Sequence, residues 1–116
     1  MASTLILPRR SLLGATTALL AAPALAQPAA PLRVGLVAVL TGPQAALGTQ
    51  LRDGWMLGMR HLNNQLGGRP TETLVIDDEL RPDVAVTKVR AALERDKVDF
   101  VVGVVFSNIL QAIIRP

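Results

Sequence analysis

The feature that most constrains this chain is a near-continuous apolar run, Leu32–Leu40, followed at once by the turn residues Thr41, Gly42 and Pro43. The run has the length of a strand, and it lacks the alternation expected of a strand with one face in water. Such a segment is typical of a strand that is buried on both faces, in a parallel sheet covered by helices. We therefore predict that Leu32–Leu40 is the first strand and lies at the centre of the sheet.

The segments after this strand alternate between helical and strand patterns. In order, they predict a helix from Ala45 or Gly48 to Leu66, a strand over Thr73–Ile76, a helix from Pro82 to about Arg95, a strand over Phe100–Val105 and a helix with Ser107 as its N-cap. Strands that alternate with helices imply parallel pairing through right-handed crossovers. The predicted fold class is α/β, a partial doubly wound parallel sheet with the first strand between the other two.

Three glycines, Gly48, Gly54 and Gly58, lie in or at the edge of the first predicted helix. A glycine inside a helix costs about 1 kcal/mol relative to alanine. Close packing of this helix against the sheet is the predicted reason for all three. The pair Gly67-Gly68 is predicted to end the helix, which Pro70 then prevents from continuing.

The first 26 residues have the three parts of a secretory signal peptide, namely the charged pair Arg9-Arg10, an apolar run over 12–22 and small residues before Gln27. We predict cleavage after Ala26, a linker over 27–31 that leads into a domain over 32–116, and a mature chain in the periplasm. The alternative is an uncleaved anchor, although the run is shorter than the roughly 20 apolar residues that span a bilayer. The arginine pair also resembles a twin-arginine export signal, which leaves the export route open.

Composition excludes several classes of site. The 116 residues include no cysteine, so a disulfide framework, a Cys-based metal site and a cysteine nucleophile are impossible, and the single histidine rules out a multi-histidine metal site. The formal charge of +3 falls to +1 without Arg9 and Arg10, and no basic stripe points to nucleic acid. The loop after the first strand has neither a G-x-G-x-x-G motif nor a phosphate-loop lysine, which argues against a nucleotide-dependent enzyme. We expect no cofactor.

Ligands of open α/β sheets bind beyond the carboxyl ends of the strands. Three predicted loops lie at that edge, over residues 41–47, 77–81 and 106–108. The acidic run Asp77-Asp78-Glu79 in the second loop is compatible with metal or acid–base chemistry. Its place between a strand and a helix favours a structural role, in which the acids end the strand and form the turn that follows it.

The order of motifs along the chain resembles the N-terminal lobe of the type 1 periplasmic binding proteins, and within them the branched-chain amino acid (leucine-binding) group of ABC importers. The resemblance rests on Val34-Gly35-Leu36-Val37, Thr41-Gly42-Pro43, Gly48, Gly54, Asn63, Gly67-Gly68, Asp77-Asp78, Pro82, Ala85, Gly103 and Ser107. It covers Leu32–Pro116, which would be only part of the first lobe. Proteins of this family have two lobes that close on a ligand and deliver it to a membrane permease.

The resemblance implies a periplasmic substrate-binding component, not an enzyme, for branched-chain amino acids or related small carboxylates, with an importer permease as partner. Ser107 matches the family serine whose hydroxyl, at a helix N-terminus, holds the ligand's α-carboxylate. Free amides and the helix dipole favour an anion at such a position. A plain N-cap is the structural alternative for Ser107.

Five further residues match positions that line the family's cleft. Val105 and Phe106 precede the serine, with core packing as their alternative, and Thr41-Gly42 match the first cleft loop, with a tight turn as theirs. Leu47 falls where relatives often place an aromatic residue that contacts the ligand side chain, and leucine is a departure from that pattern, which leaves the side-chain specificity open. Two other functions stay open, a ligand-sensing module of the same fold and a truncated, non-functional remnant.

Overall fold

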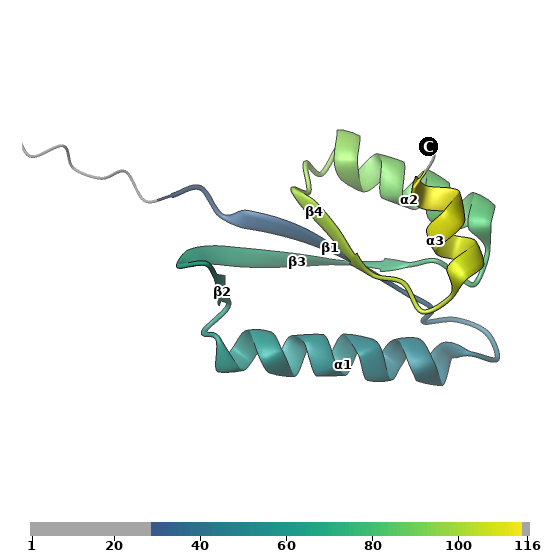
Figure 1. Cartoon of the computed structure of the whole chain (residues 1–116), viewed down its shortest axis with the longest axis horizontal. Coiled ribbons are helices and arrows are strands. Elements are labelled where there is room, and N and C mark those ends of the chain that lie inside the picture. The colour runs from purple at the N-terminus through teal and green to yellow at the C-terminus, as the bar shows by residue number, and fades with distance from the viewer. Residues whose placement is uncertain (1–28, 115–116) are drawn as a thin grey trace, which may run out of the picture.

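The computed structural model describes residues 29–114, which form a helix–sheet–helix arrangement (Figure 1). Its elements are β1 (Leu32–Ala38), α1 (Ala45–His61), β2 (Gln65–Leu66), β3 (Arg69–Asp77), α2 (Pro82–Glu94), β4 (Phe100–Gly103) and α3 (Ser107–Ile114). Helix α1 lies on one side of the strands, and α2 and α3 lie together on the other (Figure 1). The predicted signal peptide, residues 1–26, lies outside the described residues.

The strand order is β2-β3-β1-β4, and β1 pairs in parallel with both β3 and β4. In the register, Leu36 faces Val75 of β3 on one side and Val102 of β4 on the other. Every β1 residue except Arg33 is buried. The predictions of a central first strand and of parallel pairing are therefore confirmed.

The main core cluster lies on the side of the sheet that α2 and α3 cover. Its buried members are Val37, Ile76, Ala85, Val89, Ala92, Val98 and Ile109. Because side chains alternate along a strand, Val34 and Leu36 are buried on the opposite side, under α1. Full burial of each such aliphatic side chain contributes about 1.5–3 kcal/mol, so β1 stabilises both layers.

Helix α1 ends at His61, so the prediction that it continues to Leu66 is wrong. Asn63 and Asn64 both have a φ of 53°, which breaks the helical geometry, and the Asn64 amide donates to the carbonyl of Met59 at 2.7 Å. Asparagine adopts this left-handed conformation more readily than most residues.

The residues after α1 form a hairpin that the sequence analysis did not predict. Gly67 and Gly68, with φ of 57° and 75°, connect β2 to β3, and the two strands pair antiparallel. Positive φ at both central residues is what a tight hairpin turn requires. The sheet is therefore mixed, with one short antiparallel strand, and β3 begins at Arg69 instead of Thr73.

Two strands end earlier than predicted. β1 ends at Ala38 because the Leu40 amide donates to the side chain of Asp77, at 2.8 Å, and no longer to the ladder. β4 ends at Gly103 because Gly103 and Val104 both have positive φ, 94° and 72°. Helix α2, by contrast, begins at Pro82 as predicted and ends one residue before the predicted Arg95.

Within residues 29–114 no helix combines the length and the apolar character that crossing a membrane requires.

Candidate functional site

The carboxyl ends of β1 and β4 lie side by side in the sheet, since Val37 pairs with Gly103 near the end of each strand. The chain leaves β1 toward α1 and leaves β4 toward α3, and these helices lie on opposite sides of the strands (Figure 1). In open α/β sheets, ligands bind at the point where two connections diverge in this way, and that point at the ends of β1 and β4 is called the crevice below. The residues predicted from the sequence can now be placed relative to this crevice.

Thr41 and Gly42 lie in the loop between β1 and α1 and are exposed. Gly42 has a φ of 86°, and its carbonyl accepts the Ala45 amide at 3.1 Å, so the predicted tight turn is present. Leu47 lies in the first turn of α1 with 44% of its surface exposed. Three predicted residues are thus on the α1 side of the crevice.

The other three predicted residues, Val105, Phe106 and Ser107, follow β4. Helix α3 begins at Ser107, and the Leu110 amide donates to the Phe106 carbonyl at 3.1 Å. Phe106 therefore holds the cap position, and the prediction that Ser107 is the N-cap is wrong by one residue. Phe106 packs against the core cluster, in agreement with the core-packing alternative given for it from the sequence. Val105 is partly exposed.

The start of α3 presents free donors at the crevice. The amides of Ser107 and Asn108 have no hydrogen-bond partner among residues 29–114, and both residues are exposed. The first amides of a helix cannot bond within the helix, and the dipole adds partial positive charge there. This end of α3 can accept a carboxylate, with the Ser107 hydroxyl as an additional donor.

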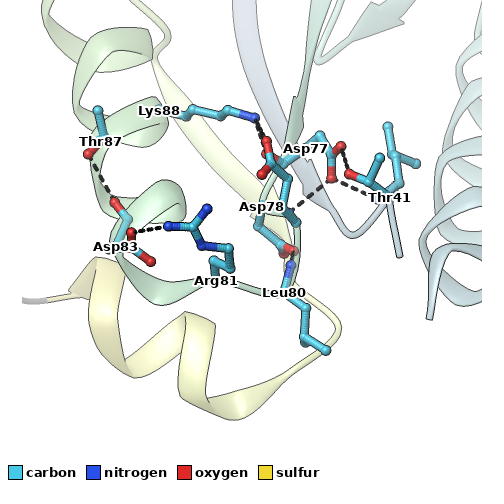
Figure 2. A network of polar contacts seen from close by, with 10 residues as sticks. Thr41, Asp77, Asp78, Leu80, Arg81, Asp83, Thr87 and Lys88 are labelled. Atoms are coloured by element: carbon cyan, nitrogen blue, oxygen red, sulfur yellow. Dashed lines mark hydrogen bonds and ion pairs between the residues drawn. The ribbon is translucent and has the colours of Figure 1, made fainter. Parts of the chain in front are cut away.

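The carboxylate of Asp77 joins the loops that follow β1 and β3 (Figure 2). Its Oδ1 accepts the amides of Leu40 at 2.8 Å and Glu79 at 3.0 Å, and its Oδ2 accepts the hydroxyl hydrogen of Thr41. Lys88 of α2 donates from Nζ to the Asp77 carbonyl oxygen and to a carboxylate oxygen of Glu79, both at 2.8 Å. The predicted strand-end and turn role of the acidic run is confirmed.

These contacts set the charge of Asp77. Partial burial raises the pKa of its carboxyl, but the hydrogen bonds from Thr41, Leu40 and Glu79 and the charge of Lys88 outweigh burial and hold the pKa below the usual value. Asp77 is therefore a carboxylate at neutral pH. A carboxylate can only accept hydrogen bonds, which fixes the direction of the three bonds to the Asp77 side chain, from Leu40, Thr41 and Glu79.

The other two acids of the run, Asp78 and Glu79, also contact other groups of the protein. Asp78 is completely buried, and its Oδ1 accepts the Leu80 amide at 2.8 Å, whereas its Oδ2 has no hydrogen-bond partner among the described residues. Glu79 is paired with Lys88. Sequence reasoning missed Lys88, whose signal would have been a lysine on the helix that directly follows the acidic run. Within residues 29–114 no group of acidic or histidine side chains could hold a metal ion.

Replacing Asp77 with asparagine is expected to lower the free energy of unfolding near neutral pH by about 1–2 kcal/mol, because hydrogen bonds to a charged acceptor are the stronger ones. The folded-state pKa lies below the ordinary value of 3.8, so the carboxylate stabilises the fold above pH 3.8, and this stabilisation is lost as the pH falls further, through the folded-state pKa. Urea unfolding should show the gap between wild type and D77N closing below pH 3.8.

The matched control is Asp53→Asn, because Asp53 is exposed and, among residues 29–114, is paired only with its neighbour Arg52. This variant is expected to change stability by less than about 0.5 kcal/mol at either pH. A D77N gap that is the same in acid and at neutral pH would contradict the role given to the Asp77 charge.

Comparison with known proteins adds to this geometry. The family profile described as "Periplasmic binding protein" matches residues 31–115. An ABC transporter substrate-binding protein from Sphaerobacter thermophilus is 36% identical, with a TM-score of 0.67 over 72% of this chain and 22% of that one. No curated protein matches the chain.

Two solved structures from Rhodopseudomonas palustris are also similar. One, a solute-binding protein of an ABC transporter in complex with benzoate, is 30% identical, with a TM-score of 0.68 over 72% of this chain and 23% of that chain. The other, an ABC-type branched-chain amino acid transporter, is 27% identical, with a TM-score of 0.65 over 71% and 23%. The chain thus spans less than a quarter of the length of each of these three relatives.

Proposed function

Because this chain belongs to the periplasmic binding protein family, we propose that it forms part of the substrate-binding component of an ABC importer and binds an amino acid or a related small carboxylate. The ligand classes come from two relatives, one a branched-chain amino acid transporter and one a benzoate complex. The proposal places the protein in the periplasm with its leader removed after Ala26, and gives it a membrane permease as partner. The N-terminal residue of the exported protein tests the cleavage site.

The observation that carries the proposal is the free N-terminus of α3 at the crevice between β1 and β4. The amides of Ser107 and Asn108, which have no partner within the described part of the chain, and the Ser107 hydroxyl are donors suited to a carboxylate. Leu47 and Val105, on the two sides of the crevice, offer partly exposed apolar surface to the body of the ligand. We propose that Ser107, Phe106, Val105, Leu47, Thr41 and Gly42 form the ligand-contacting half of the cleft.

In a two-lobed binding protein, the ligand favours the closed state through contacts with both lobes. The described residues form part of one lobe and supply only one side of such a site. We therefore expect weak binding, with a Kd of about 1 mM or weaker, for leucine and benzoate. An NMR titration should move the amide signals of residues 41–47 and 104–108 and leave those of α2 in place.

Ser107→Ala should weaken binding about tenfold or more, as expected for the loss of one hydrogen bond to a charged group, about 1.5–3 kcal/mol. Gln111→Ala is the matched control, because Gln111 is an exposed residue further along the same helix. Tight binding by the chain alone would refute the half-site account, and shifts spread evenly over the protein would refute the site itself.

A further inference from the structure

Strand β3 has one paired edge and one open edge. β1 pairs with it from Thr71 to Asp77, whereas β2, on the other edge, reaches only Arg69 and Pro70. Over residues 71–77 no strand within residues 29–114 covers this second edge, which is called the open edge below. An open strand edge presents backbone N–H and C=O groups that can pair with a further strand.

Two hydrogen bonds show which residues of β3 point to the open edge. The Thr71 amide donates at 2.7 Å to the residue that precedes β2, and the Asp77 carbonyl accepts Lys88 Nζ at 2.8 Å, so both point away from β1. The N–H and C=O of a strand residue point to the same edge, and successive residues alternate between edges. The N–H and C=O groups of Thr73 and Val75 therefore lie on the open edge.

A groove borders the open edge on the side of α2. Its volume is about 440 Å³, and four consecutive strand residues, Leu74–Asp77, line it together with residues of α2. Because side chains alternate between the faces of a sheet, consecutive residues can line one groove only along the edge of the strand. Leu74 is on the same face as the core residue Ile76 but is 38% exposed. A strand added to this edge would therefore cover apolar surface as well as backbone groups.

We infer that the open edge of β3 pairs with the open edge of a second copy of this chain, antiparallel about a twofold axis at Leu74. Thr73 of one copy exchanges both backbone hydrogen bonds with Val75 of the other, and the symmetry repeats this pair. Leu74 then faces Leu74 of the second copy. The inference goes beyond the proposed function and does not rest on it.

The open edge is complementary to itself in charge and in hydrogen bonding, which favours a second copy as its partner. In this register the outward carbonyl of Thr71 meets the outward amide of Asp77. Glu72, whose side chain is 60% exposed, lies opposite Ile76 of the other copy. That position is one residue from Asp77, which the partly exposed Lys88 contacts, so opposite charges of the two copies come together. Opposite charges across neighbouring strands stabilise the pairing.

The length and the composition of β3 also suit pairing. Residues 71–77 contain neither proline nor lysine, which commonly guard an open edge. The other outer strand of the described sheet, β4, has only four residues and ends at Gly103 with a φ of 94°. β3 therefore offers the longer edge.

Hydrogen exchange tests the pairing directly. We expect a monomer–dimer equilibrium with a Kd of about 100 µM, because a contact through one pair of strands is small. The amides of Thr73 and Val75 should then exchange about fourfold more slowly at about 1 mM chain than at about 20 µM, by mass action. The Leu74 amide points to β1 and should exchange equally at both concentrations. Sedimentation of the same samples measures the dimer.

Cross-linking tests the position of the axis. The chain has no cysteine, so Leu74→Cys introduces a single thiol. In the dimer, position 74 of each copy forms a non-hydrogen-bonded pair with a Cα separation of about 4.5 Å, within the range of a disulfide. Leu57→Cys is the matched control, because Leu57, on α1, is 52% exposed and random collisions favour it. Under mild oxidation L74C should cross-link roughly tenfold faster than L57C.

Val75→Pro tests whether backbone pairing makes the dimer. The Val75 amide points away from β1, so proline should leave the ladder to β1 intact and abolish the dimer. A chain that sediments as a monomer at about 1 mM, a dimer that V75P does not weaken, or equal cross-linking of L74C and L57C would each overturn the inference.

An edge that serves a different protein gives another result. The chain would then stay monomeric, and the Thr73 and Val75 signals would shift only when an extended peptide is added, which would also overturn pairing with a second copy. If V75P does not fold, hydrogen exchange and the L74C cross-link still decide the question. The ligand titrations of the proposed function are independent of all these outcomes.

Discussion

Gly48→Ala is expected to lower the free energy of unfolding by roughly 3 kcal/mol or more, the upper range for overpacking a close contact. A Cβ at position 48 would overlap the carbonyl oxygen of Val39 and lie 2.5 Å from its carbonyl carbon. Both atoms belong to the backbone, so no side-chain rotation can make room. Helix α1 would have to move away from the chain that leaves β1, and the loop that carries Thr41 would move with it.

The same helix supplies the control. Gly54 and Gly58 are exposed, and a Cβ at either position would meet nothing within 4 Å. Gly54→Ala should therefore raise the free energy of unfolding by about 0.5–1 kcal/mol, through helix propensity alone. Thermal unfolding followed by circular dichroism measures both. For a domain of this size, about 1 kcal/mol moves Tm by roughly 4–8 °C, so the two variants should move Tm in opposite directions by clearly resolved amounts. Equal effects at the two positions would contradict the packing argument.

These glycines illustrate what a sequence pattern can specify. Close packing was predicted for Gly48, Gly54 and Gly58 alike, and the structure confirms it only for Gly48. Each glycine interrupts a helix in the same way locally. What distinguishes Gly48 is the path of the chain after β1, which brings the Val39 backbone against it, and this contact depends on tertiary structure.

The central strand could be predicted because its apolar sequence pattern directly reflects its burial in the tertiary structure. A run that is apolar at nearly every position, without alternation, is typical of a strand with both faces buried, and every β1 residue except Arg33 is buried. The predicted parallel order then followed from the alternation of strands and helices. The end of α1 could not be predicted in this way, because Leu62 and Leu66 continue the helical spacing. The two asparagines between them instead adopt positive φ and start a hairpin.

For the candidate site, the sequence located the three loops correctly at one edge of the sheet, because strand ends in a parallel sheet must meet there. It placed the helix cap at Ser107, whereas the structure has it at Phe106. The shift arises because β4 ends early, at Gly103, and the chain turns through Val104 before α3 starts. Side-chain polarity in the loops, such as the donor role of Thr41, depends on the Asp77 contact between two loops that are distant in sequence.

Gly103→Ala is the second variant with a large expected effect, a loss of roughly 3 kcal/mol in the free energy of unfolding. Gly103 has a φ of 94°, a conformation that an alanine Cβ disfavours, and that Cβ would collide with the Val37 carbonyl oxygen and lie 3.1 Å from the Leu36 side chain. The Val37 carbonyl also accepts the Val104 amide at 2.9 Å, so the collision falls on the bond that holds the end of β4 against β1.

Gly42→Ala separates the cost of the positive φ from the cost of the collision, because Gly42 has a similar φ of 86° but no atom within 4 Å of an added Cβ. It should cost only the conformational term, about 1–2 kcal/mol. Chemical denaturation gives both values, and amide NMR reports the local consequence. Since Gly103 sets the direction in which the chain reaches Ser107, G103A should shift the Ser107 and Asn108 signals, whereas G42A should leave them in place. If G103A cost no more than G42A, the contact with Val37 would not be what fixes the start of α3, and the proposed carboxylate site beside β1 would lose its physical basis.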